Sequence, residues 1–167
     1  AGYIGSHTVH YLISIGIDPC NIIVFDNLEF GHIDHIPSDV IFIKGDLRNK
    51  VEIYNVFHNY NIDCVIHFAA YAYVGESMKK PSEYFTNNIS AGLILLDAMR
   101  DNSCTKIVFS SSCATYEPSD NKLLTEQSIQ RPINPYGESK LAFERFLFWY
   151  QQAYNIQSIS LRYFNAA

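Results

Sequence analysis

Short apolar runs alternate with longer amphipathic stretches along the whole chain. The apolar runs, rich in Val, Ile and Phe, are Ile22–Phe25, Val40–Ile43, Cys64–Phe68, Ile107–Ser110 and Ile159–Leu161. Such near-continuous apolar strands are typical of a parallel sheet that is covered on both faces. Helices are expected between them, near Ser6–Ser14, Lys50–Tyr60, Glu83–Met99 and Tyr136–Tyr154. The alternation predicts right-handed β-α-β units and therefore an α/β fold, a doubly wound parallel sheet with helices on both faces.

Two stretches near the C-terminal end add detail to this pattern. The last expected helix has an apolar stripe formed by Leu141, Phe143, Phe146, Leu147 and Tyr150. The stretch Glu117–Pro135 has no such periodicity and is the longest irregular region. Because loops of this length in compact domains are often functional, it is a candidate active-site loop.

Composition and charge exclude several classes of protein. The 167 residues suffice for one domain, and 48% apolar with 17% charged residues is ordinary for a globular protein. Twelve basic and seventeen acidic residues give a net charge of −5, which argues against nucleic acid or an anionic membrane as a partner, because both need a basic face. No apolar run reaches the ~18–20 residues of a membrane span. No secretion leader precedes the first motif.

The four cysteines are Cys20, Cys64, Cys104 and Cys113. Their separations fit no zinc spacing and no C-x-x-C motif, so no metal site is expected. We predict free thiols, buried or half-buried, in a reducing compartment, and therefore a cytoplasmic location.

The segment Gly2–His7 is typical of the second half of a Gly-rich dinucleotide-binding turn. Gly2 would let the backbone approach a pyrophosphate, and Gly5 would let the next helix pack close to the sheet. Asp26 ends an apolar run, twenty-one residues after Gly5. A carboxylate there accepts bonds from the adenosine ribose and repels a 2′-phosphate, which favours NAD over NADP in a Rossmann-type domain. The alternative, that Asp26 only begins a turn with Asn27, stays open.

Two more strand ends carry candidate residues. Asp46 would lie near the adenine ring, although an ordinary turn residue explains it nearly as well. The small residues Ala69 and Ala70 would let a cofactor pass close to the backbone. We interpret the preceding His67 as a packed strand histidine.

Tyr136 and Lys140 give the sharpest signal, because residues i and i+4 of a helix share one face. A free phenol has a pKa near ~10. A nearby lysine ammonium and a positive nicotinamide would lower that pKa, so that Tyr136 can take a hydroxyl proton while a hydride leaves the same carbon. The serines Ser110–Ser112 end a strand where ligands bind in such sheets, and a hydroxyl there can bond the substrate oxygen. A solvent-facing pair and ordinary turn serines are the alternatives.

Together these residues resemble the extended short-chain dehydrogenase/reductase family, and within it the enzymes that epimerise UDP-sugars at C4. The segments that carry the resemblance, in chain order, are Ala1–Thr8, Phe25–Leu28, Gly45–Asn49, Val65–Ala70, Val74–Ser77, Tyr84–Asn88, Phe109–Tyr116, Asn134–Leu141 and Leu161–Ala167. The resemblance implies an NAD-dependent isomerase that interconverts UDP-glucose and UDP-galactose through a 4-keto sugar. Tyr136 would be the acid–base group, Ser112 would bond the same oxygen, and Lys140 would tune Tyr136 and hold the cofactor.

The resemblance also implies ligand contacts and partners. Matching the family's NAD contacts are Gly2, Tyr3, Ile4, Gly5, Asp26, Asn27, Asp46, Leu47, Phe68, Ala69, Ala70, Asn88, Tyr136, Lys140 and Tyr163. Matching its substrate contacts are Ser112, Tyr136, Phe164 and Asn165. A homodimer is implied. The Glu83–Met99 and Tyr136–Tyr154 helices could supply its interface, although their apolar excess fits a core equally well.

Two positions depart from relatives in an informative way. Relatives that dehydrate or decarboxylate a nucleotide sugar carry acidic residues directly after the strand-end Ser or Thr, where this chain has Cys113 and Ala114. This counts against both chemistries. The family usually has Gly after Tyr116, whereas Glu117 stands here, which we expect to reshape the loop beside Ser112. Two alternatives to a UDP-glucose/UDP-galactose epimerase stay open. They are a 4-epimerase of another UDP-sugar, such as a UDP-pentose or UDP-N-acetylhexosamine, and a non-catalytic NAD-binding protein.

The chain starts inside the Gly-rich turn and stops directly after a strand. In the doubly wound order, the first strand is central, so without it two strands would face a gap lined by unpaired backbone groups. We expect residues 1–167 to be one NAD-binding Rossmann-type domain, incomplete at its N-terminus and without a C-terminal substrate domain. By itself this piece is expected to be inactive.

Overall fold

The computed structural model describes residues 1–118 and 123–166, and their strands are all parallel. Two sheets form, with strand orders β1-β2 and β3-β4-β5. Their strands are β1 (Ile23–Asp26), β2 (Ile41–Lys44), β3 (Val65–His67), β4 (Lys106–Ser112) and β5 (Gln157–Tyr163). Every predicted strand is confirmed, with ends shifted by one or two residues. As the strand order led us to expect, β1 and β3 do not pair with each other.

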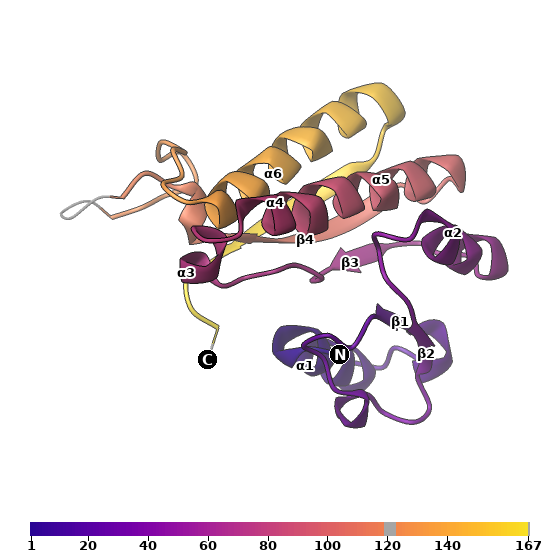
Figure 1. Ribbon diagram of the computed structural model, residues 1–167. Coiled ribbons are helices and arrows are strands. Elements are labelled where there is room, and N and C mark those ends of the chain that lie inside the picture. The colour runs from indigo at the N-terminus through magenta and orange to yellow at the C-terminus, as the bar shows by residue number, and fades with distance from the viewer. Residues whose placement is uncertain (119–122, 167) are drawn as a thin grey trace.

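Helices cover both faces of the β-structure. Figure 1 shows α4 (Pro81–Phe85), α5 (Ala91–Asp101) and α6 (Pro135–Tyr154) together on one side of β3 and β4, whereas α1 (Tyr3–Ser14) lies on the other side, beside β1 and β2. Alternate residues of β1 reflect this arrangement. Val24 packs against the cluster that includes Val9 of α1, and Phe25 packs against the cluster that includes Ile53 of α2 (Lys50–Asn59). The prediction of a doubly wound fold is confirmed.

The main core lies between β4 and the helices α5 and α6. Leu96, Met99 and Phe143 have no exposed surface, and Ile107 and Phe109 of β4 are 2% exposed. In the apolar stripe predicted for α6, Leu141, Phe143 and Leu147 are buried, and Phe146 and Tyr150 pack against the same core. Burial of this stripe therefore fixes which face of α6 meets the sheet.

Side chains define where α2 and α6 begin and where α6 ends. Asn49 accepts a hydrogen bond from Val51 N at the start of α2, and Asn134 accepts one from Gly137 N at the start of α6. These are N-caps that satisfy backbone donors of the first turn. Asn155 ends α6 in the left-handed conformation (φ 58°), which asparagine adopts more readily than most residues.

The single regular helix predicted over Glu83–Met99 is wrong in one respect, because it is interrupted by a π-helical turn at Thr86–Ser90 between α4 and α5. Periodicity does not reveal such a turn, since the segment stays helical on both sides. The turn contains the buried Asn88, and Gly92 follows it, where a Cβ would overlap the Phe143 ring. The short α3 (Val74–Ser77) precedes α4.

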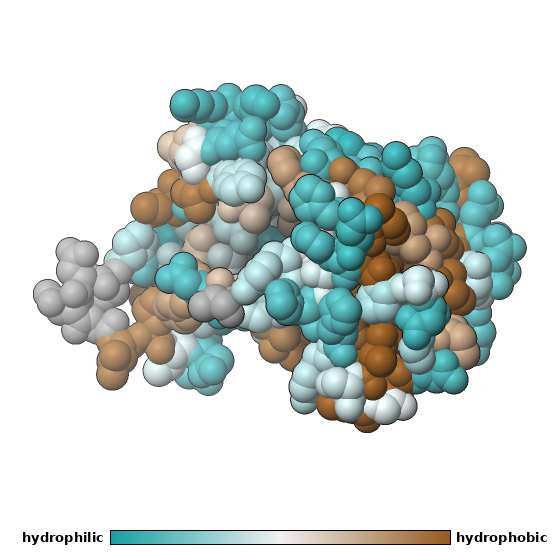
Figure 2. Space-filling view, turned by 90° about the horizontal axis from the view of Figure 1, so that it is seen from below, coloured by the Kyte–Doolittle hydropathy of each residue, from teal (hydrophilic) through white to brown (hydrophobic). Residues whose placement is uncertain are grey.

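The surface departs from expectation at two places. Among the predicted free thiols, Cys104 is buried and Cys113 is half-buried, but Cys20 and Cys64 are exposed because they lie in a short 3₁₀ turn and directly before β3. The sheet face away from α5 and α6 exposes Ile66, Ile159 and Leu161. Figure 2, which views the molecule from below, shows a band of apolar residues among polar ones. No helix within the described ranges combines the length and the apolar character that a membrane crossing requires.

We expect Leu96→Ala to lower the free energy of unfolding by about 2–5 kcal/mol, since it removes a side chain with no exposed surface from the main core. Urea unfolding of the intact protein measures this change. Leu123→Ala is the matched control, because Leu123 is 96% exposed, and its effect should stay within about 0.5 kcal/mol. Equal effects of the two substitutions would contradict the assignment of the core.

Candidate active site

A cavity of about 200 Å³ lies where β4 and β5 end and α6 begins. Its lining residues are Ile4, Phe68, Ala70, Ala72, Ser110, Ser111, Ser112, Tyr136, Lys140, Tyr163, Phe164 and Ala166. The fold thus brings the three predicted catalytic residues together with one residue of the Gly-rich turn. The cavity opens at the carboxyl ends of parallel strands, which is where ligands bind in doubly wound folds.

Lys140 is almost completely buried, at 4% exposure, and points at the end of β4. Its Nζ donates a hydrogen bond to the Ser110 carbonyl oxygen at 2.6 Å and lies 4.9 Å from the centre of the Phe109 ring. Burial lowers the pKa of Lys140 to about 7, because the charged amine loses its hydration. At neutral pH this lysine can therefore be either charged or neutral.

Tyr136 lies one turn before Lys140, with its ring centre 5.8 Å from Lys140 Nζ. Burial raises the pKa of Tyr136, and the neighbouring Ser112 hydroxyl opposes this rise only in part. The lowering of the Tyr136 pKa that we expect from Lys140 together with a positive nicotinamide stays a prediction for the NAD-bound protein. In the chain alone desolvation acts on both groups, which spacing along a helix does not reveal.

Ser112 is fixed by its neighbours at the end of β4. Its hydroxyl oxygen accepts a hydrogen bond from Ala114 N at 3.1 Å, and its carbonyl oxygen accepts one from Thr115 Oγ1 at 2.9 Å. Glu117 is not among the described non-glycine residues with positive φ. It pairs with Arg131 at 2.7 Å. The reshaping of this loop that we expect from the missing glycine stays a prediction.

A glycine lets α6 approach this turn. A Cβ on Gly137 would collide with the carbonyl oxygen of Ala114, which belongs to the backbone and cannot rotate away. Gly137 stands between Tyr136 and Lys140, so the first turn of α6 meets the end of β4 closely only because this position has no side chain.

The predicted cofactor residues at the other end form a polar network. Asp26 Oδ2 lies 2.9 Å from the backbone nitrogen of Ala1, so the Gly-rich turn and Asp26 are adjacent. Asn27 Nδ2 donates to Asp46 Oδ2 at 3.1 Å. Asp46 also receives two bonds from the Arg48 guanidinium, which hold its pKa far below the usual range despite partial burial. The turn interpretation of Asp46 is thus supported by its contacts.

Asn88 is buried and links two segments that surround the site. Its side-chain oxygen accepts from Tyr71 N at 2.8 Å, and its Nδ2 donates to Tyr71 O and to Ser139 Oγ, both at 3.0 Å. Ser139 Oγ in turn donates to the carbonyl oxygen of Tyr136. The π-helical turn thus ties the segment after β3 to the first turn of α6.

The remaining predicted site residues differ in whether they line the cavity. Tyr163 and Phe164 line it, Ala69 and Leu47 do not, and Asn165 is exposed outside the lining. Tyr3 is 59% exposed, and its ring contacts the His7 ring edge-on. His67 is packed between Phe109 and Phe143, and burial lowers its pKa to about 3, which confirms the interpretation as a core histidine.

The whole chain, residues 1–167, matches the NAD dependent epimerase/dehydratase family. The chain belongs to this family. The resemblance seen in the sequence is confirmed.

Three relatives illustrate the similarity. The chain is 47% identical to the UDP-glucose 4-epimerase of Halalkalibacterium halodurans, over 100% of its own length and 49% of that protein. The crystal structure of the Brucella ovis UDP-glucose 4-epimerase in complex with NAD matches with a TM-score of 0.94 at 42% identity, covering 100% and 50% of the two chains. The UDP-Glc/GlcNAc 4-epimerase of Campylobacter jejuni matches with a TM-score of 0.92 at 34% identity, covering 98% and 51%. The chain spans about half the length of the curated relatives that it matches.

The sequence analysis missed a half-buried ion pair next to the site. Glu144 of α6 pairs with Arg162 of β5 at 2.7 Å and accepts a hydrogen bond from Ser111. Burial would raise the pKa of Glu144, but the bonds from Arg162, Ser111 and Gln130 outweigh it and lower that pKa. The available signal was spacing, because Glu144 continues the Tyr136 and Lys140 face by one more turn.

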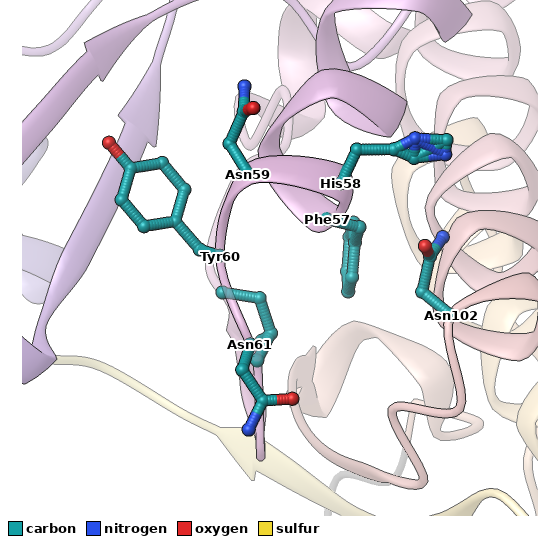
Figure 3. Close-up of a pocket in the computed structure, with 7 residues that line it drawn as sticks. Phe57, His58, Asn59, Tyr60, Asn61 and Asn102 are labelled. Atoms are coloured by element: carbon teal, nitrogen blue, oxygen red, sulfur yellow. The ribbon is translucent and has the colours of Figure 1, made fainter.

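A second hollow, of about 270 Å³, is unrelated to these residues. Figure 3 shows its lining side chains around the end of α2 and the loop that follows, with Asn102 contributed from the end of α5. It contains no carboxylate, thiol or amine. Across the described ranges, no cluster of three or more His, Cys, Asp or Glu side chains is suited to hold a metal ion.

The burial of Lys140 predicts a pH dependence of stability in the cofactor-free protein. An unfolded lysine has a pKa near ~10.4, so between pH 7 and that value the unfolded chain binds more protons than the folded one. Stability should therefore rise with pH in this window, by at most about 1.4 kcal/mol per pH unit from this group. Lys140→Met removes the group. The wild-type free energy of unfolding minus that of Lys140→Met should increase from pH 7 to 9.5, and a constant difference would contradict the buried amine.

Proposed function

We propose that the intact protein is an NAD-dependent isomerase that interconverts UDP-glucose and UDP-galactose through a 4-keto sugar. The observation that carries this proposal is the convergence of Tyr136, Lys140 and Ser112 on one cavity, which the Gly-rich turn joins through Ile4. A phenol, an amine and a hydroxyl in one cavity suit proton transfer at a carbon-bound hydroxyl.

The residues of the chain fit NAD. The first turn of α1 has no side-chain cap, so its N–H groups are available to a pyrophosphate. A Cβ on Gly2 would meet nothing within 4 Å, which indicates open space beside this turn. Asp26 would accept bonds from the adenosine ribose. The residues proposed to hold NAD are Gly2, Tyr3, Ile4, Gly5, Asp26, Asn27, Asp46, Leu47, Phe68, Ala69, Ala70, Asn88, Tyr136, Lys140 and Tyr163.

The chain's own residues move the proton. When bound, NAD would supply the oxidation and reduction at C4, together with a positive charge that favours the Tyr136 phenolate. Tyr136 Oη would take the proton of the 4-hydroxyl and return it once the sugar has turned over. Ser112 would donate a hydrogen bond to the same oxygen, where charge develops. Phe164 and Asn165, after β5, would lie beside the sugar and its diphosphate.

Related reactions on nucleotide sugars require other residues at the site. Dehydration or decarboxylation would need an acid directly after Ser112, and Cys113 and Ala114 provide none. A 4-epimerase of another UDP-sugar stays the second candidate, since one similar structure is named a UDP-Glc/GlcNAc 4-epimerase. For the intact protein we also propose a homodimer, in which the exposed Phe148 and Trp149 of α6 would be covered. We further propose a cytoplasmic location, which is consistent with free cysteines.

The substrate assignment is tested by incubating the intact protein and NAD separately with UDP-glucose, UDP-galactose, a UDP-pentose and UDP-N-acetylglucosamine. Chromatographic separation of the C4 epimers is the measurement. We expect UDP-glucose and UDP-galactose to reach the same mixture from either side. Inertness towards both, with turnover of another UDP-sugar, would favour the second candidate.

Tyr136→Phe should lower the rate of epimerisation by at least ~10²-fold, because it removes the acid–base group and keeps the ring. Tyr11→Phe is the matched control, since Tyr11 is 63% exposed on α1, and should leave the rate unchanged. Turnover of Tyr136→Phe at the wild-type rate would contradict the role of Tyr136 as the acid–base group. A wild-type protein that binds NAD but turns over no UDP-sugar would favour a non-catalytic NAD-binding protein, the candidate from another class.

A further inference from the structure

Glu144 collects hydrogen bonds from three parts of the chain. Its carboxylate accepts bonds from Ser111 Oγ at the end of β4, from Gln130 Nε2 in the loop before α6 at 3.0 Å, and from Arg162 of β5. Arg162 donates twice, from Nε at 3.0 Å and from Nη2 at 2.7 Å. Only 9% of the Glu144 side chain is exposed, so these donors replace the water that the carboxylate loses.

Arg162 extends the same set of contacts to the loop after β4. Its Nη1 donates to Tyr116 Oη at 2.9 Å, and its guanidinium lies 5.0 Å from the centre of the Tyr116 ring. The exposed fraction of the Arg162 side chain is 20%. One ion pair therefore joins α6, β4, β5 and the turn that follows Ser112.

The strand register connects this ion pair to the cavity. Ser111 pairs with Arg162 in the β4–β5 ladder, and the next pair is Ser112 with Tyr163. Successive side chains of a strand point to opposite faces. The first pair therefore meets Glu144 on the helix side. Ser111 of this pair and both members of the second pair contribute to the wall of the cavity. Glu144 itself does not line the cavity.

We propose that Glu144, acting with Arg162, is a positioning residue that fixes the Ser112–Tyr163 pair against Tyr136. The inference rests on the proposed epimerase function. Glu144 stands two turns after Tyr136 and one turn after Lys140 on the same face of α6, so its bonds to Ser111 and Arg162 set how far α6 lies along β4. An offset of about 1 Å between acid–base group and substrate can cost ~10²-fold in rate.

Glu144→Gln in the intact enzyme tests this role. The amide keeps the shape but removes the negative charge and leaves one carbonyl oxygen for the donors of Ser111, Gln130 and Arg162. We expect kcat for UDP-galactose to fall about 10–10²-fold, while KM changes less than about 3-fold and each subunit keeps its NAD. Glu138→Gln is the matched control, because Glu138 is exposed on the first turn of the same helix, and should keep the wild-type kcat.

Ser111→Ala removes a single bond to Glu144 and keeps the test decisive if Glu144→Gln does not fold. It should lower kcat about 3–10-fold with unchanged KM, bound NAD and melting temperature. If Glu144 had only a structural role, the variants would have a lower melting temperature and a lower NAD content, with kcat per NAD-loaded subunit unchanged. That result would overturn the inference. Wild-type kcat in both variants would overturn it as well. A wild-type enzyme that is inert towards every UDP-sugar would overturn the proposed function, and the inference with it.

Discussion

The hydrogen bond from Lys140 Nζ to the carbonyl oxygen of Ser110 is the contact on which the site depends. An amine buried without a partner costs several kcal/mol, so a lysine that is 4% exposed needs a fixed acceptor. The carbonyl oxygen 2.6 Å away is part of β4 and cannot move independently of the sheet. Lys140 therefore holds α6 in place along β4. Tyr136, one turn earlier on the same helix, is placed by the same contact.

One face of α6 meets the end of β4 over three successive turns. Tyr136 lies beside Ser112, Lys140 bonds the backbone of Ser110, and Glu144 accepts a bond from Ser111. The close approach is possible because Gly137 has no side chain that would collide with the backbone. A helix face with polar groups every four residues is thus matched to a strand end that carries three serines.

Much of this arrangement follows from local sequence patterns, and the remainder depends on groups far apart in the chain. Apolar runs predict the strands because both faces of the sheet are covered. The Tyr136–Lys140 spacing predicts their shared face because helical geometry is local. The raised pKa of Tyr136 and the partners of Glu144 depend on burial and on bonds between segments, which periodicity does not encode. The π-helical turn escapes prediction for the same reason, since Asn88 finds its partners only after folding.

The two ends of the proposed NAD site are held with different strength. Tyr136 belongs to the β4–α6 half, whose contacts are buried. Asp26 belongs to the β1–β2 sheet, which has no ladder to β3. The polar contacts between the two parts include the bonds of Tyr71 Oη with Arg48 and Glu29, which lie at the surface and add little stability each. Apolar contact, with Phe25 of β1 packed against the main core, therefore carries more of the alignment between the ends. A dinucleotide that contacts both ends would add its own binding free energy to this alignment, so the ligand itself would stabilise the part of the site that the described residues hold least firmly.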